Sequence, residues 1–251
     1  MNILVVHSHN ANRGDEAAVK AMVDELLIKY PGAKITISNN GFTQYPGMPE
    51  NVIQIDRFPK LESRMAQLEF FIVLLFRGKF AFTKEARKFI RALKEADVVL
   101  HAPGGPSIGD TYFKAEKLYL WRLNLIRQMG IPYIFYDPSM GPFKCASRNK
   151  LRKKVISGAE RIVLRDPISV EYVKDFLPGV EVEQALDSAL QHDIDIDKNE
   201  RKYNNYPELK KFIENHEKCI GITITDLKWH PVHKNNKIIE PVSYTHLTLP
   251  T

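Results

Sequence analysis

The chain has 251 residues, of which 44% are hydrophobic and 26% charged. This balance excludes a disordered or fibrous protein and leaves ample material for a core. The formal net charge of +6 favours anionic ligands or surfaces, but the basic residues are scattered without interleaved aromatics, so no nucleic-acid partner is expected.

The first thirty residues have the pattern of a strand, a polar turn and a helix. Residues 2–6 are a nearly continuous apolar run rich in branched side chains, which is typical of a strand buried on both faces. A polar segment over 7–15 follows, and apolar residues then recur at helical spacing up to residue 30. The turn is therefore predicted at the carboxyl end of a strand, where open α/β sheets bind ligands.

Four residues of this turn could form a site for a small anion. Gly14 would let the backbone approach a ligand closely, while Asn12, Arg13 and Asp15 offer an amide, a fixed positive charge and a carboxylate. The alternative is ordinary helix capping with Asp15 as the N-cap, because Asp is common at that position. The sequence leaves both roles open for Asp15.

Strands and helices continue to alternate along the chain. Further strands are expected at 34–38, 52–55, 97–101, 132–136, 161–164 and 180–182. Helices are expected at 61–77, from Thr83, at 113–129, at 148–157 and from Pro167. Some seven alternations predict an α/β fold with a doubly wound, mostly parallel, Rossmann-like sheet.

Several predicted strands end in glycine-rich or polar turns. The turns after 2–6, 97–101, 132–136 and 161–164 should converge on one edge of a parallel sheet and line one cleft for a small ligand. Besides the first turn, the candidate binding residues are Gly104, Gly105, Asp110, Gly141, Arg165, Asp166, Ser169 and Asp187.

Five segments in this order resemble the polysaccharide pyruvyl transferase family. They are Asn12-Arg-Gly-Asp15, Gly104-Gly105 with Asp110, Ser139-Met-Gly-Pro-Phe143, Leu164-Arg-Asp-Pro-Ile-Ser169 and Asp187-Ser-Ala-Leu190. The resemblance spans residues 1 to about 225 and implies a glycosyltransferase-B-like architecture of two Rossmann-type domains, with this chain carrying the N-terminal half. One departure is Gly104-Gly105-Pro106, where the family tends to have three glycines.

The resemblance also implies an activity. Members transfer a pyruvyl group from phosphoenolpyruvate to two hydroxyls of a cell-surface sugar, forming a cyclic ketal, with a polysaccharide or lipid-linked sugar as acceptor. Phosphoenolpyruvate is a donor substrate, so no cofactor is expected, and no His, Cys or carboxylate cluster has the spacing of metal ligands.

Two residues are the candidate catalytic groups. A guanidinium binds a carboxylate or phosphate with two parallel hydrogen bonds, so Arg165 is the expected donor contact, with Arg13 a weaker second. The alternative for Arg165 is a surface pair with Asp166, with Asp166 serving as an ordinary helix cap. Asp15 could be the base for the attacking hydroxyl. His7, His9 and His101 lie near strand ends, where a histidine is more often structural.

Two other functional classes stay open. A glycosyltransferase that uses a sugar nucleotide would share the architecture and bind its donor in the second domain. A non-catalytic Rossmann-like binding module would bind neither donor.

The chain is expected to divide into four parts. Residues 1–190 form the N-terminal domain, 191–217 a linker with a short helix at 209–215, and 218–241 the start of a second α/β domain. Residues 242–251 carry no charge and look like the translation of a sequencing adapter. The chain would then be a fragment without the donor-site residues of its second domain, and inactive alone.

A cytoplasmic location is expected, with possible contact at the inner face of a membrane. Cys145 and Cys219 are far apart, which indicates reduced thiols, and no signal peptide is visible. The helix over 61–77 is apolar around much of its circumference, which indicates either burial or contact with a membrane surface.

Overall fold

A computed structural model describes residues 1–10, 12–40, 44–59, 63–111, 113–191, 197 and 204–220. The chain divides into two compact units, Met1–His192 and Asp193–Thr251. In the second unit the described part contains one helix, α8 (Pro207–Glu214), close to the predicted 209–215. The predicted second domain lies outside the described residues from 221 onward, as does the tail over 242–251.

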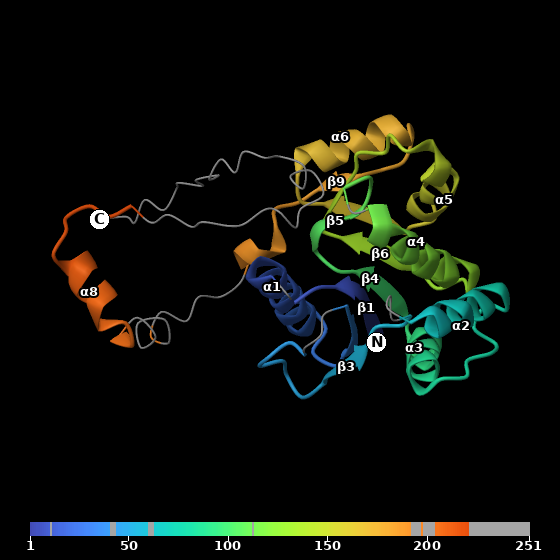
Figure 1. The fold of residues 1–251 in the computed structure, drawn as a ribbon, viewed down its shortest axis with the longest axis horizontal. Helices are drawn as coiled ribbons and strands as arrows, with labels where there is room; N and C mark the ends of the chain where they lie inside the picture. The colour runs from blue at the N-terminus through green and yellow to red at the C-terminus, as the bar shows by residue number, and fades with distance from the viewer. Residues whose placement is uncertain are drawn as a thin grey trace. The chain divides into compact units, whose positions relative to one another are not determined.

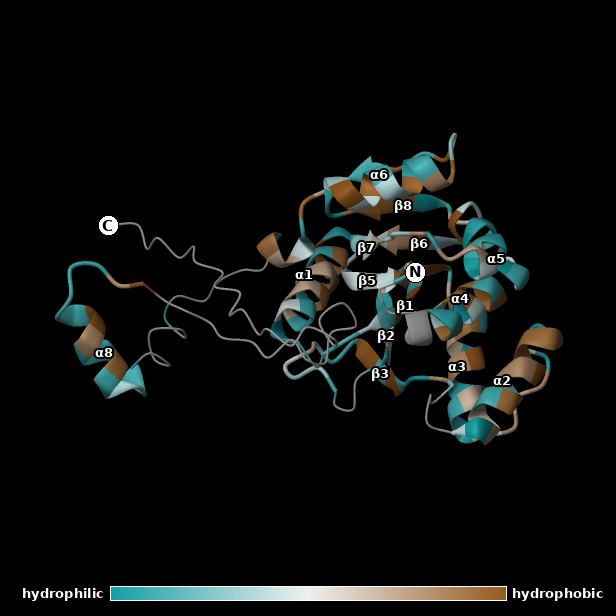
Figure 2. Ribbon diagram, turned by 45° about the horizontal axis from the view of Figure 1, so that its top comes forward, coloured by the Kyte–Doolittle hydropathy of each residue, from teal (hydrophilic) through white to brown (hydrophobic). Residues whose placement is uncertain are grey.

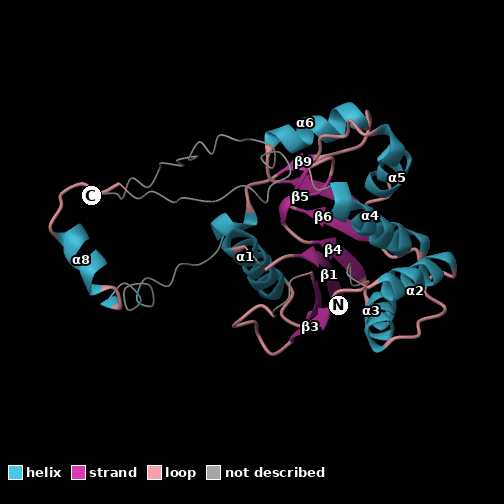
Figure 3. Ribbon diagram, viewed as in Figure 1, coloured by secondary structure: helices cyan, strands magenta, loops and turns pink. Residues whose placement is uncertain are grey.

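The first unit is built on a seven-stranded sheet in which every neighbouring pair is parallel (Figures 1 and 3). Its strand order is β3-β2-β1-β4-β6-β8-β9. The strands are β1 (Asn2–Ser8), β2 (Lys34–Asn39), β3 (Val52–Asp56), β4 (Val98–His101), β6 (Tyr133–Tyr136), β8 (Arg161–Leu164) and β9 (Glu183–Gln184). This sheet confirms the predicted parallel α/β class.

Helices cover both faces of the sheet. They are α1 (Arg13–Lys29), α2 (Arg64–Leu75), α3 (Lys84–Glu95), α4 (Phe113–Gln128), α5 (Ala146–Ile156), α6 (Pro167–Phe176) and the short 3-10 helix η1 (Ser188–Gln191). Ile3 and Val5 of β1 pack with α1, whereas Leu4 and Val6 pack in a second cluster with α2 to α6. Side chains alternate across a strand, so these two clusters lie on opposite faces and the fold is doubly wound.

The strand order places a topological switch point between β1 and β4. From β1 the chain moves to β2 and β3 on one side, and later to β4 and β6 on the other. Ligands of open α/β sheets bind outside the carboxyl ends of the strands at such a point. The turns predicted to converge therefore do share one edge.

Three details differ from the predictions. The N-cap of α1 is Asn12, whose side chain accepts a hydrogen bond from the Gly14 N–H, so Asp15 lies in the first turn and is not the cap. The expected glycine-rich loop contains a strand, β5 (Gly104–Ile108), which pairs with β7 (Pro138–Met140) in a separate two-stranded parallel sheet. The last strand is Glu183–Gln184 rather than 180–182, because its backbone aligns there with β8.

Helix α2 is shorter than predicted and α5 begins earlier, at Ala146. The predicted cap Thr83 is confirmed, since its side chain accepts from the Ala86 N–H at the start of α3. Within the described residues, no helix combines the length and the apolar character needed to cross a membrane.

Candidate functional site

A pocket of about 600 Å³ lies beyond the carboxyl ends of β6 and β8. It is built from β7, the start of α6 and the segment before η1. Five of its lining residues were predicted as site residues from the sequence: Gly141, Arg165, Asp166, Ser169 and Asp187. The remaining residues are Thr111, Ser139, Met140, Pro142, Ile168 and Tyr172.

Arg165 is held on two sides within this pocket. Its Nη1 lies 2.6 Å from Oδ2 of Asp187, and its Nε donates to Oγ of Ser139 at 3.0 Å. The Ser139 hydroxyl in turn donates to Oδ2 of Asp166 at 2.8 Å. The guanidinium therefore has fixed partners, and a bound anion would have to compete with the Asp187 carboxylate.

Asp166 is the N-cap of α6. Its carboxylate accepts from the Ser169 N–H at 2.7 Å and from the Ser169 hydroxyl at 2.8 Å. Burial alone would favour the protonated acid, but these bonds, with that from Ser139, lower the pKa of Asp166 below its usual value. The Ser169 Oγ also accepts from the Met140 N–H, so this cap joins α6 to β7.

Asp15 approaches the same pocket from α1. Its carboxylate accepts from the Gly105 N–H and interacts with Arg165 and Asp187 through space. At Gly104 the backbone has φ +136°, and a Cβ there would lie 2.9 Å from Oδ1 of Asp15. Gly104 therefore permits the close approach between β5 and Asp15.

Burial raises the pKa of Asp15 above its ordinary value, and the Arg165 charge and the Gly105 hydrogen bond oppose the rise only in part. A carboxylate whose pKa is raised is a stronger base than one in water. This shift fits a group that removes a proton from a hydroxyl.

Asp137, which directly follows β6, is a buried carboxylate that was not among the predicted site residues. It is 2% exposed, has φ +61°, and its Oδ1 has no hydrogen-bond partner. Its Oδ2 accepts from the Ser188 N–H at 2.6 Å. Burial, assisted by the nearby Asp187 charge, raises the pKa of Asp137 to about 6. Its position immediately after an apolar strand was a signal that could have identified it.

Carboxylates outnumber cations in this region. Arg165 is the one cation among the described residues lining the pocket, and it faces Asp166 and Asp187, with Asp15 and Asp137 within electrostatic range. This arrangement favours ligands that donate hydrogen bonds, such as sugar hydroxyls, over free anions.

Some predicted residues do not join the pocket. The Arg13 side chain is 90% exposed and pairs with Glu16 of the same helix turn. Asn12 and Gly14 are exposed and serve the N-terminus of α1.

Asp110 has both carboxylate oxygens engaged elsewhere. Oδ1 pairs with Nη2 of Arg152 at 2.6 Å, and Oδ2 accepts from the N–H groups of Lys144 and Cys145. Arg152 also pairs with Glu116, and both side chains are fully buried. Asp110 therefore anchors the start of α5 to the core, which favours a structural role.

The three histidines lie together at the ends of β1 and β4. Burial is the main reason that the pKa of His7 is lowered and that the pKa values of His9 and His101 fall to about 4. His101 Nε2 lies 2.7 Å from the Ser107 hydroxyl, and His9 Nε2 lies 3.0 Å from the Tyr119 hydroxyl. Neutral rings with such partners fit the expected structural role for His9 and His101, whereas neither ring nitrogen of His7 has a hydrogen-bond partner among the described residues.

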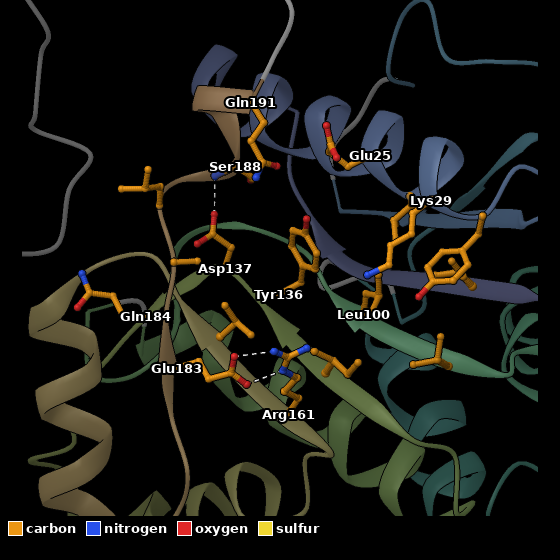
Figure 4. A pocket seen from close by; sticks show the side chains of 18 of the residues that line it. Glu25, Lys29, Leu100, Tyr136, Asp137, Arg161, Glu183, Gln184, Ser188 and Gln191 are labelled. Carbon is orange, nitrogen blue, oxygen red and sulfur yellow. Dashed lines mark hydrogen bonds and ion pairs between the residues drawn. The ribbon is translucent and has the colours of Figure 1, made fainter.

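A second pocket, of about 510 Å³, lies against the sheet face that α1 partly covers (Figure 4). Figure 4 shows Asp137 joined to Ser188 at one side and the Arg161–Glu183 pair at another. Apolar strand residues including Leu100 form much of its wall, and it contains none of the predicted site residues.

Among the described residues, no group of three His, Cys, Asp or Glu side chains is arranged to hold a metal ion.

The fold and the pocket define a Rossmann-like α/β protein with a carboxylate-rich site at the carboxyl edge of its sheet. The family model of polysaccharide pyruvyl transferases matches residues 12–247, so the chain belongs to the polysaccharide pyruvyl transferase family and is a transferase. This confirms the predicted family. The match extends six residues into the stretch 242–251.

A comparison with curated proteins gives no match. Among solved structures, a sucrose-phosphate synthase from Thermosynechococcus elongatus is similar with a TM-score of 0.38 and 11% identity. The similarity covers 83% of this chain and 99% of that chain. At this level the likeness carries no weight for function.

Proposed function

We propose that this protein takes part in the transfer of a pyruvyl group from phosphoenolpyruvate to two hydroxyls of a polysaccharide or lipid-linked sugar, forming a cyclic ketal. The family supports a transferase that modifies a polysaccharide. The observation that carries the finer proposal is Asp15, a half-buried carboxylate of raised pKa that interacts electrostatically with Arg165 of the pocket.

The reaction needs two hydroxyl protons to be moved. Each sugar oxygen forms a bond to C2 of the enolpyruvyl group, the C2–O bond to phosphate breaks, and C3 gains a proton to become a methyl group. The two protons lost by the hydroxyls balance the one gained at C3 and the one carried away by phosphate. Asp15 accepts the proton of an attacking hydroxyl, because burial makes it more basic than an exposed carboxylate.

The other polar groups of the pocket position the acceptor. Carboxylates accept hydrogen bonds from sugar hydroxyls, and Asp187 is 36% exposed at its side chain. Arg165 holds Asp187 in place and supplies the nearest positive charge for a carboxylate or phosphate of the donor. Gly141, with φ +90°, packs so closely against Tyr172 that a Cβ there would lie 2.5 Å from Cδ2 of that ring.

The test incubates the chain, and any longer clone that contains it, with phosphoenolpyruvate and a panel of sugar glycosides. Phosphate release together with a new methyl singlet in the proton NMR spectrum supports ketal formation. Release of phosphate without an acceptor, or turnover only with a sugar nucleotide, would refute it.

An Asp15→Asn variant tests the base. In whichever of these proteins shows turnover, the substitution should lower kcat by about 10²–10⁴-fold, the usual contribution of a positioned acid or base. The control is Asp24→Asn, since Asp24 is exposed on α1. Equal rates for Asp15→Asn and the unsubstituted chain would remove Asp15 from the mechanism.

A further inference from the structure

Helix α2 and the turn that follows it expose an unusual number of large apolar side chains. We call this surface the α2 patch; it consists of Met65, Leu68, Phe71, Leu75, Phe76, Phe80 and Phe82. Their exposed fractions run from 44% for Phe76 to 74% for Met65. Figure 2 shows brown on the ribbon of α2 at the periphery of the first unit. Concentrated apolar exposure of this kind marks an interaction surface.

The α2 patch is a second apolar face of the helix. The inner face is already formed by Phe70 and Val73, which are fully buried, and Phe70 packs against Phe58 with ring centroids 5.6 Å apart. Met65, Leu68 and Leu75 recur at helical spacing on the outer face. The outer face of α2 therefore remains exposed after the first unit has folded, although most of its residues are apolar.

The turn after α2 presents its aromatics in a defined geometry. The Gly78 N–H donates to the Val73 carbonyl and the Arg77 N–H to the Leu74 carbonyl, which is the hydrogen-bond pattern of a Schellman motif. Phe76 and Phe80 then meet edge to face, with ring centroids 5.1 Å apart. The apolar surface thus continues from the helix into an ordered turn.

The exposed charges between residues 63 and 84, the stretch that carries the α2 patch, are all positive. Between residues 63 and 84 the basic residues Arg64, Arg77, Lys79 and Lys84 are all exposed. The single acidic residue of this stretch, Glu69, is buried, and its carboxylate accepts from the N–H groups of Phe82 and Thr83. The apolar surface is therefore edged by cations without exposed acids between them.

We propose that the α2 patch docks onto the surface of an anionic lipid bilayer. The apolar side chains enter the boundary between headgroups and acyl chains, while the four cations meet lipid phosphates. A second copy of the chain is a poorer partner, because a two-fold symmetric contact would bring the four cations of one patch close to the same four cations of the other. The contact does not depend on the donor, and it would hold the transferase where a lipid-linked acceptor lies.

The test measures binding of the chain to vesicles of phosphatidylcholine with and without phosphatidylglycerol. We expect binding to the anionic vesicles, weakened by added salt, and little binding to neutral ones. Phe71→Gln with Leu75→Gln should weaken binding about tenfold or more, because each lost apolar side chain no longer enters the bilayer. Ile28→Gln with Ile53→Gln is the matched control, since both are exposed apolar residues on α1 and β3.

A second pair of variants tests the charges. Lys79→Gln with Lys84→Gln should weaken binding to anionic vesicles about tenfold, whereas Lys150→Gln with Lys154→Gln on α5 should not. All substituted side chains are exposed, so melting temperatures should stay constant and report intact folding.

Three outcomes would overturn the proposal. They are no binding of the unsubstituted chain to anionic vesicles, equal binding by the patch variants, or a dimer that the patch variants dissociate. The last, measured by light scattering, would assign the α2 patch to contact between copies.

Discussion

Replacement of Asp137 by Asn should change how the stability of the first unit depends on pH. Asp137 is buried, its Oδ1 lacks a partner, and its pKa is raised from the model-compound value of 3.8 to about 6. The folded state therefore binds this proton more tightly than the unfolded state does. As pH rises from about 4 to about 6, the free energy of unfolding falls, because the unfolded chain loses its proton first.

The magnitude follows from the pKa difference. A rise of about two units corresponds to about 3 kcal/mol of stability that is present below pH 4 and lost above pH 6. Asn has the same shape, keeps an acceptor for the Ser188 N–H, and does not ionise. Relative to the unsubstituted chain, Asp137→Asn should thus gain about 3 kcal/mol between pH 4 and pH 8, or about 6–12 °C in melting temperature.

Denaturant titrations of both chains at several pH values measure this difference. The control is Asp24→Asn, an exposed carboxyl on the same unit, which should not reproduce the trend. The contrast between pH values is the decisive quantity, because the new amide adds an offset that does not depend on pH. If the stability difference between Asp137→Asn and the unsubstituted chain stays constant from pH 4 to pH 8, the pKa of Asp137 is not raised in the folded state.

Three further predictions concern other parts of the chain. Gly141→Ala should destabilise the fold by about 2–4 kcal/mol, because φ is +90° and the new Cβ would lie 2.5 Å from Cδ2 of Tyr172. Gly32→Ala is the control, since a Cβ at Gly32 would have no atom within 4 Å. Equal melting temperatures for the two variants would contradict the prediction. In a longer clone that contains this chain, Arg165→Lys should weaken phosphoenolpyruvate binding by about 1–3 kcal/mol in calorimetric titrations, because the ammonium keeps the charge but loses the two parallel bonds. Unchanged affinity would leave Arg165 as a structural partner of Asp187 and Ser139. Truncation after Pro241 should leave the melting temperature unchanged if 242–251 is adapter-derived, and a clear loss of stability would show that this stretch belongs to the fold.

The class of the fold and the edge of the sheet that carries the site could both be predicted from the amino-acid sequence. Alternation of apolar strands with amphipathic helices requires a parallel sheet, and a parallel sheet places the ends of β1, β4, β6 and β8 on one side. Residues 150 positions apart, such as Asp15 and Arg165, could therefore be predicted to meet. Local pattern and chain direction suffice for such conclusions.

The role of each side chain at that edge could not be predicted, because it depends on the partners that folding brings to it. Asp110 was predicted to bind the substrate, but its carboxylate forms an ion pair with Arg152. Arg165 was predicted to bind the donor, but its guanidinium forms an ion pair with Asp187. Asp137 carried no motif, and its raised pKa arises from burial and from the Asp187 charge. Partner choice, burial and pKa depend on contacts between segments distant in sequence, and these exist only once the chain has folded.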